Sequence, residues 1–232
     1  MGASSRVTAR TTRRSGARSL VAIVAFLGVA LCVALTPSQA LALRRIMIIG
    51  DSIQSGTDLH RASDQASFRL QREGNVIVHD FASPGARMTD SFFLGMNHAA
   101  PAVWLLHGLF GMSGLVVSLG TNDWGAGVDL EAFSRTYRAF LAALPPSLHV
   151  ACMSMTWSAA EATLNAKGNS MDEFRDAIRA TCTAMGKVYL DGKDAIPHSR
   201  EYFRDEFHPN DRGHRFMGAF LVHRLRELGW LE

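Results

Sequence analysis

Short apolar runs of strand length alternate along this chain with longer segments of helical period. Such alternation is typical of a parallel β-sheet whose strands are joined by crossover helices. We therefore expect an α/β fold with five parallel strands. The expected strands are 46–49, 76–79, 115–119, 149–154 and 188–190, and the expected helices are 62–72, 130–143, 171–185 and 211–228.

No internal repeat or low-complexity linker interrupts this pattern, so a second domain is not expected. Residues 91–113 are less regular, because glycines break a partly helical pattern there. We expect an irregular helix and a loop in this segment.

The first 42 residues have the three parts of an export signal. Five arginines and no acidic residue open the chain, an apolar stretch follows at 20–35, and Ala40-Leu41-Ala42 provides a small-x-small cleavage site. We expect cleavage before Leu43, with an uncleaved membrane anchor as the alternative. Residues 1–42 are thus a predicted signal peptide, residues 43–232 a predicted single domain, and the protein is expected to be periplasmic or secreted.

Removing this leader changes the charge of the chain. The leader holds 5 of the 24 basic residues and none of the 21 acidic ones, so 19 basic residues remain against 21 acidic ones, a net charge of −2. The basic pI therefore belongs to the leader and gives no support for a nucleic-acid partner. Contact with a membrane is expected only through the leader, if it stays attached.

Two cysteines remain after the leader, Cys152 on an expected strand and Cys182 on an expected helix. An exported compartment permits a disulfide between them, and two buried free thiols are the alternative. Neither cysteine has the spacing of a metal site, so we expect no metal bound through them.

Polar clusters follow directly after the expected strands. Gly50-Asp51-Ser52 follows the first, Ser83-Pro84-Gly85 the second, and Gly120-Thr121-Asn122-Asp123 the third, while Asp205 and His208 follow the fifth. The carboxyl ends of parallel strands lie along one edge of an open sheet, and ligands bind there. These four clusters are therefore predicted to converge in space.

The residue types in these clusters suit nucleophilic catalysis on an ester. Ser52 can act as the nucleophile and His208 as its general base. Asp205, through its carboxylate or less favourably its backbone carbonyl, can orient the imidazole. Donors for a developing oxyanion are the backbone N–H of Ser52, the N–H of Gly85 and the side-chain amide of Asn122.

Taken together, these residues resemble the SGNH family of GDSL-type esterases and lipases, whose hallmark residues are Ser, Gly, Asn and His. Here they are Ser52, Gly85, Asn122 and His208, in the family's order and spread over nearly the whole chain after the leader. The resemblance implies a three-layer α/β/α fold similar to flavodoxin. It also implies hydrolysis of carboxylic esters, thioesters or sugar O-acetyl groups without a metal or other cofactor.

A second Asp-x-x-His spacing, Asp211 to His214, competes with the first. We favour His208 because His214 falls inside the last expected helix, whereas His208 precedes Pro209 in a loop. Trp124 and Trp157 each follow a strand and are candidates for a substrate pocket, with core packing as the alternative.

The leading hypothesis is an exported serine ester hydrolase, similar to a carboxylesterase or lipase, that works through a Ser-His-Asp triad and an acyl-enzyme. Within the same family, a polysaccharide O-acetyl esterase and a thioesterase remain open, so the substrate is a small or lipid ester or an acetylated glycan. Remote alternatives are a glycan-binding protein without activity and a metal-dependent phosphoesterase that uses Asp51, Asn122, Asp123 and His208 as ligands.

Overall fold

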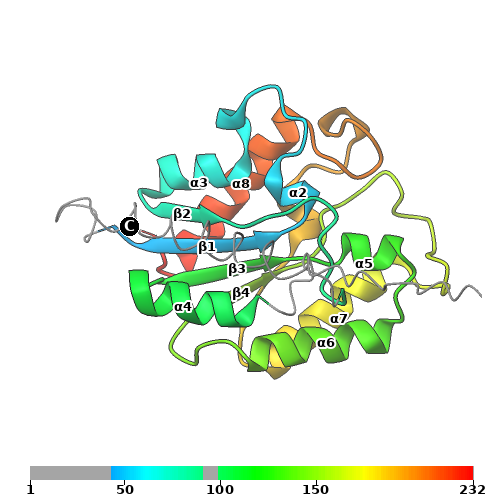
Figure 1. The fold of residues 1–232 in the computed structure, drawn as a ribbon. Helices are drawn as coiled ribbons and strands as arrows, with labels where there is room; N and C mark the ends of the chain where they lie inside the picture. Colours follow the sequence, from blue (N-terminus) through cyan, green and yellow to red (C-terminus); the bar gives the residue numbers. More distant parts are fainter. Residues whose placement is uncertain (1–42, 91–98, 232) are drawn as a thin grey trace, which may run out of the picture. The chain divides into compact units, whose positions relative to one another are not determined.

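Five parallel strands form the central sheet of the computed structural model, which describes residues 43–90 and 99–231 (Figure 1). Their order across the sheet is β2-β1-β3-β4-β5, and every neighbouring pair is parallel. The α/β class and the five strands predicted from the sequence are confirmed. The strands are β1 (Arg45–Gly50), β2 (Ile77–Asp80), β3 (Gly114–Ser118), β4 (His149–Met153) and β5 (Val188–Leu190).

Helices cover both faces of the sheet, which completes the three layers (Figure 1). Helices α3 (Ala66–Gly74) and α8 (Asp211–Glu227) lie on one face, and α4 (Ala100–Phe110), α6 (Leu130–Ala142) and α7 (Met171–Ala184) lie on the other. Short helical turns stand between the longer elements. These are α2 (Ser52–Ser55), α5 (Thr121–Gly125), η1 (Ala62–Asp64), η3 (Gly192–Ala195) and η4 (Arg200–Tyr202).

Strand side chains alternate between two hydrophobic cores. Met47 and Ile49 of β1 enter the core beneath α4, α6 and α7, whereas Ile46 and Ile48 enter the core beneath α3 and α8. All four are at most 2% exposed. Because both faces of the sheet are covered, the strand reads in sequence as a continuous apolar run and lacks a polar face.

Side-chain caps fix where the last two long helices begin. Ser170 and Glu173 form a reciprocal capping box at the start of α7. The side chain of Asn210 accepts hydrogen bonds from two backbone N–H groups in the first turn of α8. Helix α8 therefore begins just after His208 and Pro209, which leaves His208 in a loop.

The predicted helices agree with the structure except at two segments. The segment predicted as one helix over 62–72 is a 3₁₀ turn followed by α3, with Gln65 in a non-helical conformation between them. Within the irregular segment 91–113, residues 100–110 form the regular helix α4, and 91–98 lie outside the described residues.

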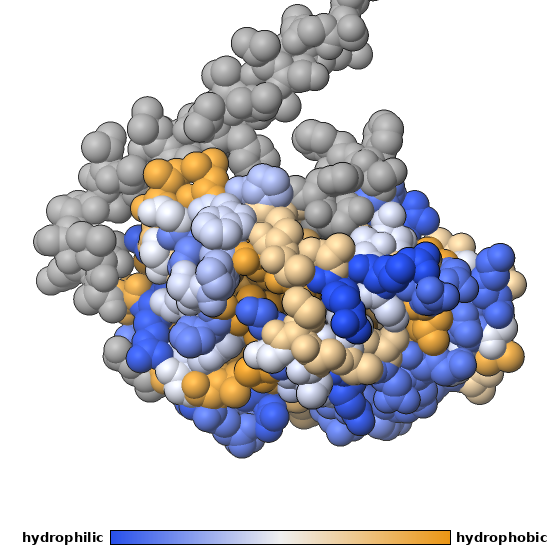
Figure 2. All heavy atoms as spheres, turned by 90° about the horizontal axis from the view of Figure 1, so that it is seen from below, coloured by the Kyte–Doolittle hydropathy of each residue, from blue (hydrophilic) through white to orange (hydrophobic). Residues whose placement is uncertain are grey.

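The outer face of α4 is unusually apolar. Trp104, Leu105 and Leu109 are each at least half exposed, and Figure 2 shows apolar patches among hydrophilic residues on this side of the protein. None of the helices in the described part of the chain is long and apolar enough to cross a membrane. The predicted signal peptide, residues 1–42, lies outside the described residues.

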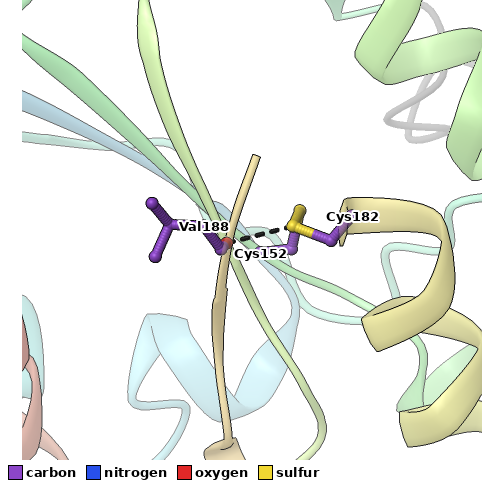
Figure 3. The surroundings of a disulfide bond; sticks show 3 residues. All are labelled: Cys152, Cys182 and Val188. Carbon is purple, nitrogen blue, oxygen red and sulfur yellow. Dashed lines mark hydrogen bonds between the residues drawn. A yellow bond between two sulfur atoms is a disulfide. The ribbon is translucent and has the colours of Figure 1, made fainter. Parts of the chain in front are cut away.

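The two cysteines of the domain are joined by a disulfide between β4 and α7 (Figure 3). Cys152 and Cys182 are both fully buried, and the Cys182 sulfur lies 3.0 Å from the carbonyl oxygen of Val188 in β5. Of the two alternatives left open by the sequence, the structure has the disulfide. It ties a covering helix to the strand beneath it.

The strand order reverses at β1, which has β2 on one side and β3 on the other. In open α/β sheets this switch point leaves a crevice at the carboxyl ends of the strands. Ser52 follows β1 and Asn122 follows β3, so the topology places both at this crevice.

Candidate active site

Ser52, His208 and Asp205 form a connected chain of hydrogen bonds. Ser52 Oγ lies 2.9 Å from His208 Nε2, and His208 Nδ1 lies 2.7 Å from Asp205 Oδ2. Because an ionised carboxylate only accepts, Nδ1 carries the proton and Nε2 accepts the hydrogen bond from the Ser52 hydroxyl. This is the geometry in which a histidine can remove the proton of a serine nucleophile.

A tight turn after β1 presents Ser52. A side chain at Gly50 would lie 2.6 Å from the side chain of Gln54, so the turn requires glycine there. The Asp51 carboxylate accepts a hydrogen bond from Ile53 N at 2.9 Å and caps α2, whose first residue is Ser52. Asp51 thus anchors the turn. Burial raises its pKa to about 7, although the Ile53 N–H opposes this shift.

The Asp205 carboxylate stabilises the loop that contains Asp205 and His208. Asp205 Oδ1 accepts hydrogen bonds from His208 N at 2.7 Å and Phe207 N at 2.8 Å, so the side chain that orients the imidazole also fixes the loop backbone. Partial burial would raise the pKa of Asp205, but the hydrogen bonds from these backbone N–H groups and from His208 lower it to about 2. The carboxylate therefore stays charged at neutral pH.

Asn122 lies in α5 and contacts the loop that contains Gly85. One amide N–H of Asn122 donates to the carbonyl of Ala86 at 3.1 Å, which leaves its second N–H for another acceptor. Gly85 occupies an exposed turn with φ +77°. Its N–H has no acceptor among the residues that the structure describes.

Asp123 fastens this loop to α5. Its carboxylate accepts hydrogen bonds from Met88 N at 2.8 Å, Thr89 N at 2.9 Å and Thr89 Oγ1 at 2.7 Å. Burial raises the pKa of Asp123, and these hydrogen bonds counteract the shift. Asp123 thus has the loop-holding role expected for it from the sequence.

A small cavity of about 110 Å³ opens beside Ser52. Trp124 forms one wall, and its ring centroid lies 5.9 Å from that of Phe207. The sequence did not single out Phe207, although its place directly before His208 in the Asp-x-x-His block was a usable signal. The lining residues are Ser52, Ile53, Thr121, Asn122, Trp124, Gly125, Phe207 and His208.

Three of the predicted residues do not line this cavity, and one of them is Asp205, which contacts His208 Nδ1 instead. Gly85 lies on the neighbouring loop, one residue before the carbonyl that Asn122 contacts. Trp157 packs elsewhere, stacked on His198 at 5.7 Å and edge-on to Phe203 at 5.4 Å. For Trp157 the structure therefore favours the core-packing alternative.

The competing Asp-x-x-His spacing does not form a second pair. Asp211 accepts hydrogen bonds from the backbone and ring of His60. His214 is 1% exposed inside α8, and within the described residues its Nδ1 has no hydrogen-bond partner. Burial lowers the pKa of His214 to about 4, so this histidine is neutral at pH 7.

The ligands proposed for a metal-dependent phosphoesterase have other partners here. Asp123 accepts three hydrogen bonds from Met88 and Thr89 of the neighbouring loop, and Asp51 caps α2. Among residues 43–90 and 99–231, no three or more His, Cys, Asp or Glu side chains are grouped so that they could hold a metal ion.

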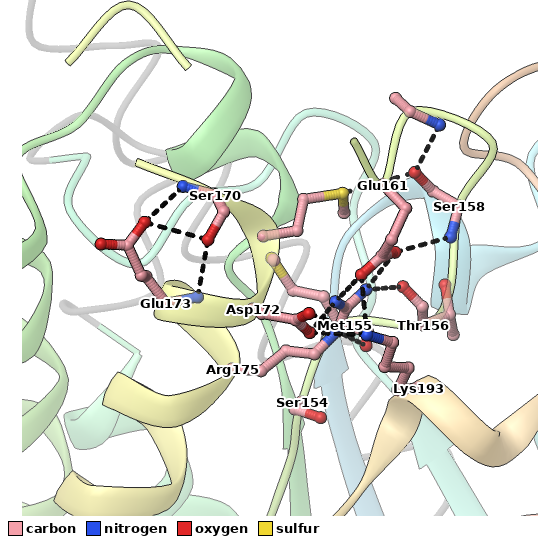
Figure 4. A network of polar contacts seen from close by, with 12 residues as sticks. Ser154, Met155, Thr156, Ser158, Glu161, Ser170, Asp172, Glu173, Arg175 and Lys193 are labelled. Atoms are coloured by element: carbon pink, nitrogen blue, oxygen red, sulfur yellow. Dashed lines mark hydrogen bonds and ion pairs between the residues drawn. The ribbon is translucent and has the colours of Figure 1, made fainter. Parts of the chain in front are cut away.

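A network of polar contacts around Arg175 holds the loop after β4 (Figure 4). Arg175 of α7 is 3% exposed and donates to the carbonyls of Met155 and Thr156 at 2.9 and 2.7 Å and to the Glu161 carboxylate. Further along, the carbonyl of Asn169 accepts from the indole of Trp124 at 3.0 Å. The buried arginine thus fixes a loop that in turn holds one wall of the cavity.

Fold and site together define a class of α/β proteins in which a serine, a histidine and an aspartate meet at the carboxyl edge of a parallel sheet, the arrangement of serine ester hydrolases. The chain belongs to the GDSL-like lipase/acylhydrolase family, whose sequence profile matches residues 48–216. It is therefore an ester hydrolase of the SGNH type.

Solved structures of low sequence identity share this fold. A lipase/acylhydrolase from Enterococcus faecalis has a TM-score of 0.66 at 18% identity, over 82% of this chain and 98% of the other. A carbohydrate acetylesterase family member from Sinorhizobium meliloti has a TM-score of 0.62 at 16% identity, over 80% and 99%. An esterase EstA from Pseudoalteromonas sp. has a TM-score of 0.63 at 13% identity, over 80% and 98%. No curated protein matches the sequence.

Proposed function

We propose that this protein hydrolyses short-chain carboxylic esters through a covalent acyl-enzyme on Ser52. The main support for this proposal is the chain of hydrogen bonds that runs from Ser52 Oγ through His208 to the Asp205 carboxylate. In the first step Ser52 Oγ attacks the ester carbonyl while His208 Nε2 takes the hydroxyl proton. His208 then passes that proton to the departing alcohol.

Water completes the cycle by the same route. His208 Nε2 removes a proton from a water molecule, the hydroxide attacks the acyl-enzyme, and the proton returns to Ser52 Oγ as the acid leaves. The negative oxygen of each tetrahedral intermediate would be stabilised by the Ser52 N–H, the free amide N–H of Asn122 and the Gly85 N–H. Asp205 keeps the imidazole in the required tautomer and stabilises its cationic form.

The size of the cavity supports a short acyl group. Its volume is about 110 Å³, and a water-sized group occupies roughly 30 Å³. This space can enclose an acetyl to butyryl chain, whereas most of a palmitoyl chain would lie outside it. Ile53, Trp124 and Phe207 give the cavity apolar walls that suit an alkyl chain.

A sugar O-acetyl ester is the second candidate substrate. The small cavity favours an acetyl group over a long acyl chain, and one structural neighbour belongs to a carbohydrate acetylesterase family. The exposed mouth formed by the Asp205 loop would leave room for a bulky alcohol, since the Asp205 side chain is 53% exposed.

Hydrolysis of p-nitrophenyl esters from acetate to palmitate tests both proposals. We expect acetate to butyrate to be preferred, and Ser52→Ala and His208→Ala to lose activity while Ser134→Ala, a helix serine on α6, retains it. Wild-type rates in Ser52→Ala would refute the mechanism, and a preference for palmitate would refute the short-chain assignment. Excess EDTA should leave the rate unchanged, and acetylated xylan would reveal the sugar ester activity.

We also propose that the enzyme works outside the cytoplasm after cleavage before Leu43. The arginine-rich start, the apolar stretch and the Ala40-Leu41-Ala42 site support this. Expression with the leader should yield an extracytoplasmic protein whose first residue is Leu43. Recovery of a membrane-bound protein with an intact leader would indicate an anchor instead.

A further inference from the structure

Arg204, directly before Asp205, connects the two segments that hold the nucleophile and the base. Its Nη2 donates to the carbonyl of Thr57 at 2.7 Å, and its Nη1 lies 3.5 Å from the carbonyl and 3.2 Å from the carboxylate of Asp58. The Arg204 side chain is 25% exposed. It reaches across from the His208 loop to the chain just after α2.

On the nucleophile side, Thr57 is tightly coupled to Ser52. The carbonyl of Ser52 accepts from the N–H of Gly56, from Thr57 N at 3.4 Å and from Ser55 Oγ at 3.2 Å. Ser55 Oγ in turn contacts Thr57 Oγ1 at 2.9 Å. A displacement of Thr57 therefore displaces the turn that presents Ser52.

On the base side, the backbone of Arg204 closes the loop of His208. Arg204 N donates to the carbonyl of His208 at 2.8 Å, and Phe203 forms a bridge with Pro209. The opposite side of the loop is held independently, because Ala159 N donates to the carbonyl of Glu206 at 2.9 Å. The loop thus keeps support when the Arg204 side chain is removed.

The sheet itself fixes the distance between these segments only indirectly. Ser52 follows β1 and His208 comes after β5, and β3 and β4 lie between those two strands. The contact of His60 with Asp211 joins the same two segments farther from the pair, whereas Arg204 joins them directly beside the Asp205–His208 loop. Positioning errors of about 1 Å can reduce the rate of an enzyme by about 100-fold.

We propose that Arg204 is a positioning residue that sets the alignment of Ser52 with His208 by binding the backbone carbonyls after α2. This inference rests on the proposed function of that pair. The alignment depends on the backbone carbonyls of Thr57 and Asp58. The ion pair with Asp58 contributes little, because its carboxylate is 74% exposed. A planar guanidinium reaches two carbonyls at once, which an ammonium group does not.

The test compares Arg204→Met, Arg204→Lys and Asp58→Asn in the purified enzyme with p-nitrophenyl acetate. Asp58→Asn removes the ion pair only, and asparagine tolerates the left-handed backbone at this position, φ +60°. Arg135→Met, which removes an exposed arginine paired with Glu131 on α6, controls for loss of a positive charge.

We expect Arg204→Met to lower kcat by about 10- to 100-fold with KM changed less than about twofold, because alignment and not binding is lost. Arg204→Lys should be intermediate, and Asp58→Asn and Arg135→Met should match wild type. The rate of phosphonylation of Ser52 by a fluorophosphonate should fall in parallel with kcat, and melting temperatures should stay within a few degrees.

A kcat for Arg204→Met within about threefold of wild type would overturn the inference, as would an equal loss in Asp58→Asn. If Arg204→Met does not fold, an unchanged kcat in Arg204→Lys overturns it as well. Ser52→Ala, assayed in parallel, distinguishes failure of the proposed function from failure of the role of Arg204. Activity in Ser52→Ala refutes the proposed function. An inactive Ser52→Ala together with a fully active Arg204→Met refutes only the role of Arg204.

Discussion

Ser52 Oγ and His208 Nε2 lie 2.9 Å apart although 156 residues separate them in the chain. The parallel sheet makes this contact possible, because it brings the loops after β1 and β5 to the same edge.

Asp205→Asn should reduce kcat by about 10²- to 10⁴-fold, because an amide at this position no longer selects the tautomer in which Nε2 accepts from Ser52. The asparagine oxygen can still accept from Phe207 N and His208 N, so the loop should keep its fold. Steady-state kinetics with p-nitrophenyl acetate measure the effect. Circular dichroism checks the fold, and an unchanged kcat would show that Asp205 does not orient His208.

Phe207→Ala should extend the range of acyl chains that the enzyme accepts. Removing the ring enlarges the cavity next to Trp124, and each additional methylene bound there is worth about 1 kcal/mol. The ratio of kcat/KM for octanoate to that for acetate should rise by about tenfold or more. Phe216→Ala, an exposed phenylalanine on α8, is the control. A ratio that stays the same would place the acyl group elsewhere.

Asp51→Asn should remove a pH dependence of stability. The folded pKa of Asp51 is raised by burial from 3.8 to about 7, so the native state binds a proton that the unfolded state releases. The contribution of Asp51 to wild-type stability should therefore fall as the pH rises from 4 to 7, by on the order of a few kcal/mol, and change little above that range. Asparagine has no such proton to lose.

Chemical denaturation of both proteins at pH 4.5 and pH 8 measures this difference. Asp51→Asn should gain stability relative to wild type at pH 8 and not at pH 4.5. The same gain at both values would mean that Asp51 does not titrate in this range.

Glu161→Ala should destabilise the protein by about 3 kcal/mol, because it removes the less exposed of the two carboxylates paired with the buried Arg175 and leaves only Asp172. Glu131→Ala provides a matched control, since its pair with Arg135 is exposed on both sides and should contribute less than about 1 kcal/mol. Urea denaturation measures both values. Equal effects would indicate that the cluster around Arg175 contributes no more than a surface pair.

Much of the fold could be predicted because burial on both faces of the sheet produces a recognisable local pattern of apolar residues in the sequence. The continuous apolar run 46–49 and the amphipathic pattern of α6 and α7 both arise in this way. Short turns such as α5 produce no such pattern, since five residues span little more than one helical turn.

The candidate site was predicted in part. Ser52 and Asn122 could be found because each stands in a polar cluster just after a strand, and His208 because it stands in an Asp-x-x-His block before the last helix. The structure places all three around one cavity. Trp157 follows a strand in the same way, yet its ring packs between His198 and Phe203. The direction of a side chain after a strand depends on the path of its loop, which local sequence does not determine.

The sequence alone determined the parallel α/β architecture, the chemical types at the carboxyl edge and the preference for His208 over His214, because each depends on local pattern and on the order of the elements along the chain. The tertiary structure alone decided the small volume of the cavity, the disulfide between Cys152 and Cys182 and the bridge from Arg204 to Thr57. These features depend on distances between segments far apart in the chain, and only the packing of the helices and loops around the sheet sets those distances.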